Sequence, residues 1–133
     1  MFPAILIAAA LAAGAAQAQD AAMGEKVFAR CKACHEIASP DGAIVRGGKT
    51  GPNLYGVIGR TAGTADFPRY GDSLRAAGEK GLVWTEESLV DYLKDPTAFL
   101  RTYLDDPTAR SQMAFKLPRG AEDVAAFLAT HAE

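Results

Sequence analysis

A chain of 133 residues has the size of one domain, and its 49% hydrophobic and 23% charged residues exclude a disordered or collagen-like protein. The net charge of −2 gives no support to a nucleic-acid-binding protein or to attachment to an anionic membrane. The two cysteines lie three positions apart, which excludes a scaffold held together by several disulfides.

The first eighteen residues have the pattern of a secretory signal peptide. Residues 2–16 form an apolar run, shorter than the roughly 20 residues that span a bilayer. The run ends in Ala16-Gln17-Ala18, the small-x-small pattern of a signal peptidase site, although no Lys or Arg precedes it. We therefore expect cleavage near Ala18, export to the periplasm, and one mature domain over residues 19–133 without a transmembrane anchor. An uncleaved anchor is the alternative.

The first half of the mature domain is predicted to be one helix followed by loops. Apolar residues at spacings of three and four predict a helix over residues 20–34, with Asp20 as its N-cap. Residues 40–81 hold ten of the 13 glycines and show no alternation of apolar and polar residues. We expect turns there, without strands and with one short helix over residues 73–78.

Helical signals return after residue 81. Thr85 is a candidate N-cap for a helix over residues 86–94. Asp95-Pro96 begins a further helix, because a capping carboxylate is followed by proline at the first helical position. Asp106-Pro107 repeats this pair for a single turn, and the last helix is predicted to begin near Ala121. The sequence therefore predicts an all-α domain.

A C-x-x-C-H motif, Cys31-Lys32-Ala33-Cys34-His35, carries the chemistry. In an exported protein this motif is typical of covalent haem c attachment. Helical residues three positions apart share a face, so both thiols can reach the two vinyl groups along one side of a porphyrin. His35 lies one turn beyond Cys31, where its imidazole can bind the iron. The motif predicts one covalently bound haem c per chain.

Three other interpretations of the motif find less support. A thioredoxin-type thiol pair needs a strand before the motif, and none is predicted. A zinc site needs four ligands and would have to recruit His131 near the C-terminus. A local disulfide between Cys31 and Cys34 would leave His35 without a role.

The second axial ligand of the iron has two candidates. Met113 lies far from the motif, in a segment between predicted helices, and Met/His pairs are a known axial ligation. Met23 is too close to the cysteines along the same helix to reach the opposite side of a haem. His131 is the rival and would give a bis-histidine haem. We expect Met113 to be the ligand.

At the level of the whole mature chain, the motifs form an ordered set. They are C-K-A-C-H at 31–35, K-T-G-P-N-L-Y-G at 49–56, G-R-T-A-G at 59–63, Trp84, Tyr92, and S-Q-M-A-F at 111–115. The set resembles the class I cytochromes c, of the bacterial cytochrome c2 type. The resemblance implies a cytochrome c fold, in which N- and C-terminal helices cross and loops and short helices surround one haem. At the crossing, Gly24 and Phe28 would pack against Val124 and Phe127.

The resemblance also implies roles for residues around the haem. Pro52 would accept a hydrogen bond from the haem-binding His35 through its carbonyl, and the hydroxyl of Tyr92 would lie near the sulfur of Met113. Two carboxylates in a poorly hydrated place need hydrogen-bond donors. The residues that the resemblance assigns to the haem propionates are Arg60, Tyr70 and Trp84, with Ser111 as a further donor.

A haem with both axial positions filled favours electron transfer over substrate chemistry, and a thioether ligand raises the reduction potential. We therefore expect a monohaem carrier of single electrons, not an enzyme. One alternative is a haem enzyme or small-ligand sensor, whose sixth position would be open or labile. Another is a non-haem interaction protein held by a disulfide between Cys31 and Cys34.

Basic residues beside the haem-binding motifs suggest how partners dock. They would form a ring around the exposed haem edge and steer it to acidic surfaces. The resemblance implies a quinol–cytochrome c oxidoreductase as electron donor and a photosynthetic reaction centre or terminal oxidase as acceptor, in transient complexes with a monomeric carrier. The residues of this predicted ring are Arg30, Lys32, Lys49, Lys116 and Arg119.

Overall fold

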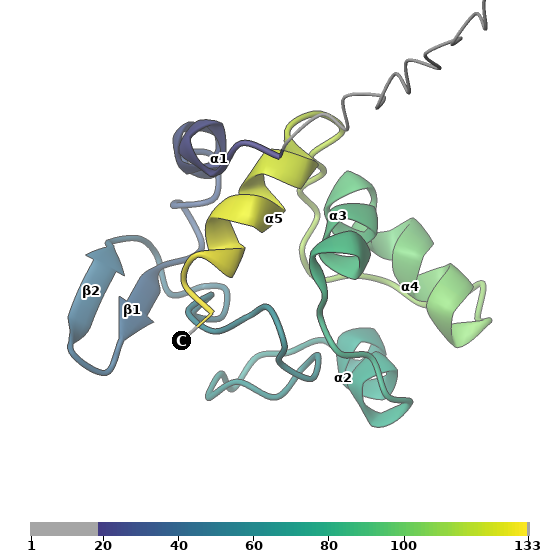
Figure 1. Cartoon of the computed structure of the whole chain (residues 1–133). Helices are drawn as coiled ribbons and strands as arrows, with labels where there is room; N and C mark the ends of the chain where they lie inside the picture. Colours follow the sequence, from purple (N-terminus) through teal and green to yellow (C-terminus); the bar gives the residue numbers. More distant parts are fainter. Residues whose placement is uncertain (1–18, 133) are drawn as a thin grey trace, which may run out of the picture.

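The computed structural model describes residues 19–132, so the predicted signal peptide, residues 1–18, lies outside the described residues. Five helices and one two-stranded hairpin are present in this part of the chain (Figure 1). None of the described helices has the length and apolarity that crossing a membrane requires. In chain order the elements are α1 (Ala21–Phe28), β1 (Ile37–Ser39), β2 (Gly42–Val45), α2 (Asp72–Glu79), α3 (Glu86–Lys94), α4 (Pro96–Leu104) and α5 (Ala121–Ala129).

The first and last helices cross, as the resemblance implied, and a glycine makes the crossing close (Figure 1). A Cβ atom on Gly24 of α1 would overlap the backbone carbonyl of Asp123 and lie 2.9 Å from Cβ of Phe127. The rings of Phe28 and Phe127 pack with their centroids 5.6 Å apart. Asp20 caps α1, as predicted, by accepting a hydrogen bond from the backbone N–H of Met23.

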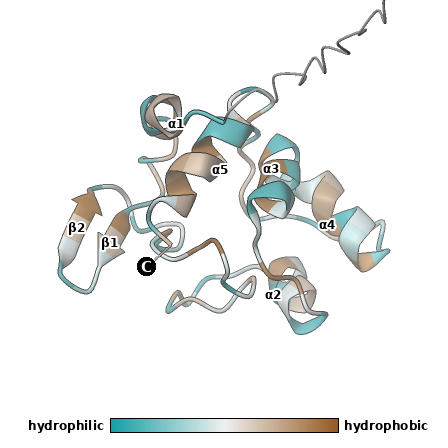
Figure 2. Cartoon of the chain, in the orientation of Figure 1, coloured by the Kyte–Doolittle hydropathy of each residue, from teal (hydrophilic) through white to brown (hydrophobic). Residues whose placement is uncertain are grey.

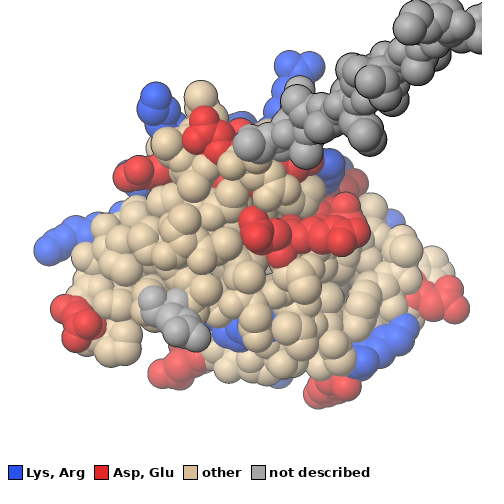
Figure 3. Space-filling model, in the orientation of Figure 1, with Lys and Arg blue, Asp and Glu red and all other residues tan. Residues whose placement is uncertain are grey.

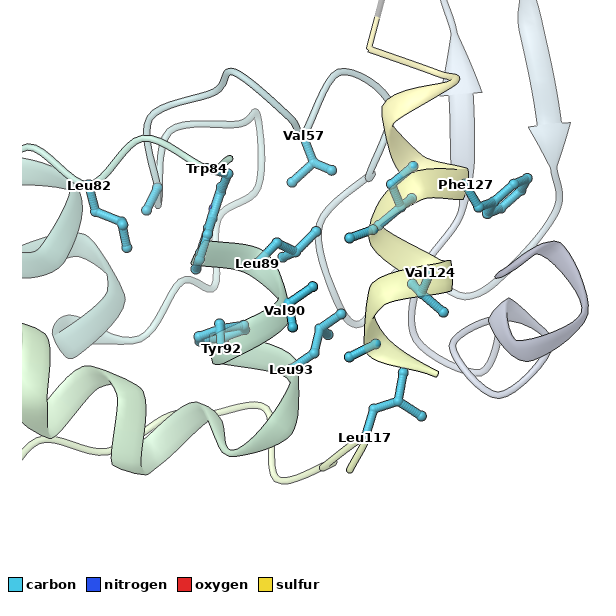
Figure 4. Packing of buried hydrophobic residues seen from close by; sticks show 14 of the residues in the cluster. Val57, Leu82, Trp84, Leu89, Val90, Tyr92, Leu93, Leu117, Val124 and Phe127 are labelled. Carbon is cyan, nitrogen blue, oxygen red and sulfur yellow. The ribbon is translucent and has the colours of Figure 1, made fainter. Parts of the chain in front are cut away.

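Helices α3 and α5 face each other across a large part of the apolar core. Figure 4 shows Leu89 and Leu93 of α3 pointing toward α5, which contributes Val124. Trp84 precedes α3 and lies in the same cluster. In Figure 2, α5 is hydrophilic over its first turn and hydrophobic beyond it, because Glu122 and Asp123 occupy that first turn. Acidic residues there also complement the helix dipole.

The two middle helices begin at the predicted caps. Thr85 accepts a hydrogen bond from the backbone N–H of Ser88, and the Ser88 hydroxyl accepts one from the backbone N–H of Thr85. Asp95 caps α4 by accepting from the backbone N–H of Ala98, with Pro96 at the start of the helix. Because capping depends on residues a few positions apart, these bounds follow from local sequence.

Asp95 should give the stability of the protein a pH dependence. The backbone N–H of Ala98 and the ammonium of Lys116 hold the pKa of the Asp95 carboxyl below its ordinary 3.8. A depressed pKa stabilises the fold above pH 3.8, and that stabilisation is lost as the pH falls through the folded-state value. We expect Asp95→Ala to lower the guanidinium unfolding midpoint modestly at pH 7, and we expect this difference from the parent to shrink well below pH 3.8, where the parent carboxyl is protonated. Asp91→Ala, which removes a carboxylate at an exposed position inside α3, is the control and should leave the midpoint at pH 7 near that of the parent.

The predicted first helix is too long. α1 ends at Phe28, and turns continue to Cys34. The carbonyls of Lys32 and Cys34 accept hydrogen bonds from the backbone N–H groups of Gly48 and Gly51, both at 2.8 Å. Where the motif begins, the N–H groups of Arg30 and Cys31 already bond the carbonyls three residues earlier, those of Val27 and Phe28, so the α-helix tightens into turns. The helical spacing of the sequence shows neither set of bonds.

The expectation of no strands between residues 40 and 81 is wrong, although the fold is mostly helical. β1 and β2 form an antiparallel hairpin, in which Ser39 pairs with Gly42 and Ile37 with Val45. The side-chain amide of Asn53 holds β1 by accepting from the N–H of Ala38 and donating to its carbonyl. The strands are too short to show alternation, and a distant side chain holds one of them, so the sequence pattern gave no signal.

Candidate functional site

A cavity of about 560 Å³ lies between the turns after α1, helix α3 and the segment that precedes α5. Its size lies within the roughly 300–1,000 Å³ of pockets that enclose organic ligands. All ten predicted site residues line it, although they come from separate stretches of the chain. These are Cys31, Cys34, His35, Pro52, Arg60, Tyr70, Trp84, Tyr92, Ser111 and Met113.

The turns after α1 place the motif at the cavity wall. The backbone N–H of His35 donates to the carbonyl of Cys31 at 3.0 Å, so one helix-like turn separates the imidazole from the first thiol. Both thiols are free, Cys31 half-buried and Cys34 exposed. Burial raises the pKa of the Cys31 thiol. The motif therefore presents two thiols and an imidazole to one cavity.

The loop after the hairpin orients the ring of His35. Nδ1–H of His35 donates to the carbonyl oxygen of Pro52 at 2.8 Å, the hydrogen bond that the resemblance implied. This bond places the ring proton on Nδ1 and leaves the lone pair of Nε2 for a metal. Burial lowers the pKa of His35, which keeps the imidazole neutral at pH 7. The ring is thus held in the tautomer that an iron ligand needs.

The lack of a side chain at Gly51 leaves the space that the ring of His35 occupies. A Cβ atom on Gly51 would lie 2.8 Å from Nδ1 and 2.9 Å from Nε2 of His35. We expect Gly51→Ala to push the ring from its place and lower the free energy of unfolding by about 1–3 kcal/mol, as overpacking does. Guanidinium unfolding of the protein, matured with its cofactor and followed by visible absorption, measures the change. An unchanged midpoint would contradict this packing.

Arg60 supplies a test of whether the cavity fits a haem. Its Nη1 donates to the carbonyl of Asn53 at 3.0 Å, but its buried Nε–H has no partner in the described part of the chain. An unpaired buried donor is costly, and a carboxylate is a natural acceptor for a guanidinium. Apolar walls, two thiols, an imidazole, a thioether and an unpaired guanidinium donor together fit haem c and its propionates.

Trp84 and Tyr70, also assigned to the propionates, each make a hydrogen bond within the protein. The backbone N–H of Trp84 donates to the carbonyl of Arg60 at 2.9 Å, which ties the two residues together. The hydroxyl of Tyr70 accepts from the backbone N–H of Ala65 at 3.2 Å. Its own proton is therefore still available to an acceptor in the cavity.

Met113 and His131, the two candidates for the second axial ligand, lie in different places. Met113 lines the cavity. His131 packs edge-on against Phe127, with ring centroids 5.2 Å apart, and lines a separate hollow of about 350 Å³. Met23 is 44% exposed on α1 and is not part of the cavity wall. Of the three, Met113 alone is placed to bind a group in the cavity.

Tyr92 and Ser111 form a hydrogen-bonded pair beside Met113. Their hydroxyl oxygens are 3.2 Å apart, and the backbone N–H of Ser111 donates to Oγ1 of Thr97 at 3.1 Å. Burial raises the pKa of Tyr92, so the phenol stays neutral. The pair fixes the start of the segment that carries Met113.

Two of the five cations of the predicted basic ring already contact other side chains of the protein. Lys32, Lys49 and Arg119 are exposed, but Lys116 pairs with Asp95 at 3.2 Å and Arg30 lies over the ring of Phe115. Both signs of charge occur on the face that Figure 3 shows.

Two further cations line the cavity, Arg69 and Arg110, and sequence reasoning missed both. Each is a direct neighbour of a predicted site residue, Tyr70 or Ser111, and that adjacency was the available signal.

Comparisons with known proteins agree on one relationship. No family model matches the chain. The chain is 58% identical over 125 residues to cytochrome c2 of Rhodobacter capsulatus, covering 93% of this chain and 91% of that protein. It is 62% identical over 112 residues to cytochrome c-551 of Roseobacter denitrificans, covering 84% of this chain and 80% of that protein.

Solved structures give the same result for the fold. Cytochrome c2 from Rhodobacter capsulatus matches with a TM-score of 0.83 at 58% identity, covering 86% of this chain and 99% of that chain. Ferric cytochrome c-550 from Paracoccus versutus matches with a TM-score of 0.82 at 48% identity, covering 86% of this chain and 98% of that chain.

Proposed function

Because the chain belongs to the cytochrome c2 and c-550 family of class I cytochromes c, we propose that it carries single electrons in the periplasm between membrane-bound redox complexes. The proposed donor is a quinol–cytochrome c oxidoreductase, and the proposed acceptor is a photosynthetic reaction centre or a terminal oxidase. The chain is a monohaem electron carrier by family and is not an enzyme. The observation that carries the proposal is the single cavity that gathers the motif and Met113.

Four side chains of the cavity wall would hold the cofactor. Haem c, when bound, supplies an iron that exchanges one electron with a partner. Cys31 and Cys34 would form the thioether links, and His35 and Met113 would be the axial ligands. The carbonyl oxygen of Pro52 lies 2.8 Å from Nδ1 of His35 and keeps the ring proton on that nitrogen. The same ligands can serve both oxidation states, so little rearrangement accompanies the transfer of an electron.

The surroundings of the site favour a high reduction potential. Leu89, Leu93, Val124 and Leu128 line the cavity and are buried, so water has little access to its inner wall. A thioether ligand and a poorly solvated haem both raise the potential. The unpaired donor of Arg60 would compensate the charge of a propionate. These features support an electron carrier over an enzyme or sensor with an open iron position.

The proposed partners would meet the cavity edge. Lys32 and Lys49 are exposed next to the cavity-lining residues Cys31 and Thr50. Basic side chains at such an edge steer a carrier toward acidic docking surfaces and make association faster at low salt. The complexes would be small and transient, with a monomeric carrier that binds no nucleic acid. Export to the periplasm, with cleavage of the signal peptide near Ala18, is part of this proposal.

The test is spectroscopic first and kinetic second. The protein is produced with its haem-maturation machinery, and visible spectra are recorded in both oxidation states. We expect a sharp c-type reduced spectrum and, in the oxidised protein, the weak far-red band of sulfur-to-iron ligation. Reduction by a quinol–cytochrome c oxidoreductase should slow as the salt concentration rises. A protein without haem, or a haem without the far-red band, would overturn the proposed ligands. Absence of reduction would overturn the proposed donor.

A further inference from the structure

In the segment that carries Met113, residues 111–117, backbone hydrogen bonds to the helices are made only at the two ends. The backbone N–H of Ser111 donates to Oγ1 of Thr97 in α4, and the backbone N–H of Leu117 donates to the carbonyl of Leu93 in α3 at 2.7 Å. Between these ends, no backbone N–H of residues 112–116 finds a protein acceptor in the part of the chain described. The middle of the segment therefore depends on side-chain contacts.

One of those contacts joins the segment to the haem-attachment motif. The guanidinium of Arg30 lies over the ring of Phe115, 5.2 Å from its centroid. Arg30 immediately precedes Cys31, and Phe115 follows Met113 by two positions. Both side chains line the cavity, Arg30 exposed and Phe115 half-buried. The stacking thus links the wall that holds His35 with the segment that holds Met113.

We infer that Arg30 is a positioning residue, whose stacking on Phe115 holds the Met113 segment closed over the cavity and so hinders replacement of Met113 by an external ligand. The inference rests on the proposed role of Met113 as axial ligand. It assigns Arg30 a function inside the carrier, in addition to any role of its charge in docking.

The size of the effect follows from the contact. An external ligand can reach the position of Met113 only when the segment moves away, which separates Arg30 from Phe115. A cation over an aromatic ring at an exposed site stabilises the closed state enough for an about two- to fivefold change in the opening equilibrium. The ion pair of Lys116 with Asp95 is exposed on both sides and adds little.

Imidazole is the probe of this opening, and the oxidised, haem-loaded protein is the sample. Binding is followed by loss of the far-red band. We expect Arg30→Gln to strengthen apparent imidazole binding about two- to fivefold. Phe115→Leu, which keeps an apolar side chain, should have a similar effect. The double variant should exceed neither single variant by much, because both remove the same contact. Arg30→Lys, which keeps the charge, should lie between Arg30→Gln and the parent.

Lys80→Gln is the matched control, because the ammonium of Lys80, directly after α2, lies 5.3 Å from the ring centroid of Tyr103 in α4, a cation–aromatic contact away from the cavity. It should leave imidazole binding unchanged. The guanidinium unfolding midpoint of Arg30→Gln should stay near that of the parent, which separates local opening from general loss of stability.

Three results would overturn the inference. They are equal imidazole binding by Arg30→Gln and the parent, fully additive effects in the double variant, and an equal effect of Lys80→Gln. A parent without the far-red band would instead show that the proposed axial ligand is wrong, and the role of Arg30 would fall with it. If the parent shows the band and the variants bind imidazole as the parent does, only the inferred role of Arg30 is overturned, and Met113 stays the proposed ligand.

Discussion

Replacing Met113 with alanine should lower the reduction potential of the haem-loaded protein by roughly 0.1–0.3 V, a part of the 0.8 V or so over which axial ligands set haem potentials. The same variant should lose the far-red band when oxidised and bind carbon monoxide when reduced. The physical reason is that Met113 lines the cavity. Removing its thioether takes away the ligand that favours the reduced iron and opens a coordination position. Redox titration and difference spectra with carbon monoxide measure both effects.

Two control variants make this prediction specific. Met23→Ala removes a methionine that is 44% exposed on α1, and it should leave the potential and the spectra as in the parent. His131→Ala removes the rival ligand, which packs on Phe127 away from the cavity, and it should leave the far-red band in place. A potential that Met113→Ala does not change would exclude Met113 as the ligand, and a haem that His131→Ala opens to carbon monoxide would assign the ligand to His131.

Gly24→Val should lower the free energy of unfolding by about 3 kcal/mol, at the upper end of what overpacking usually costs. A Cβ atom at this position would overlap the backbone carbonyl of Asp123 and come within 2.9 Å of Cβ of Phe127. Backbone and Cβ atoms cannot turn away as the end of a flexible side chain can. The only relief is to move α1 away from α5, which would also loosen the packing of Phe28 on Phe127.

Ala22→Val is the matched control for the helix crossing. It adds the same β-branched side chain to α1 at an exposed position, so it carries the small loss of helix propensity without the overlap. Guanidinium unfolding of both variants, followed by far-ultraviolet circular dichroism, separates the two costs. Equal midpoints for Gly24→Val and Ala22→Val would contradict the close approach of α1 to α5 at Gly24.

Local sequence determined the features that depend on neighbours a few residues apart. Thr85 and Asp95 each place a side-chain oxygen before a helix, and α3 and α4 begin directly after them. The same holds for the motif, because two thiols and an imidazole within five residues must reach the same group. The ordered motifs also pointed to the family, because all of them occur together along one chain of the right length.

Tertiary structure decided whatever depends on contacts between distant residues. Hydrogen bonds between distant residues hold the turns after α1 against Gly48 and Gly51 and hold β1 against Asn53, and no periodicity in the sequence encodes them. Spacing left Met113 and His131 both open as ligands, and only the packing of the chain puts one on the cavity wall and the other against Phe127.

The basic residues near the motifs also show the difference between what the sequence predicts and what the fold decides. The sequence supplied five cations near the motifs, but the fold pairs Lys116 with Asp95 and lays Arg30 over Phe115. A charge acts through its surroundings, and those surroundings are made by residues far away in the chain. The sequence by itself therefore predicted the cofactor chemistry and determined where α3 and α4 begin, whereas the tertiary structure decided which groups face the cavity and which cations are free to meet a partner.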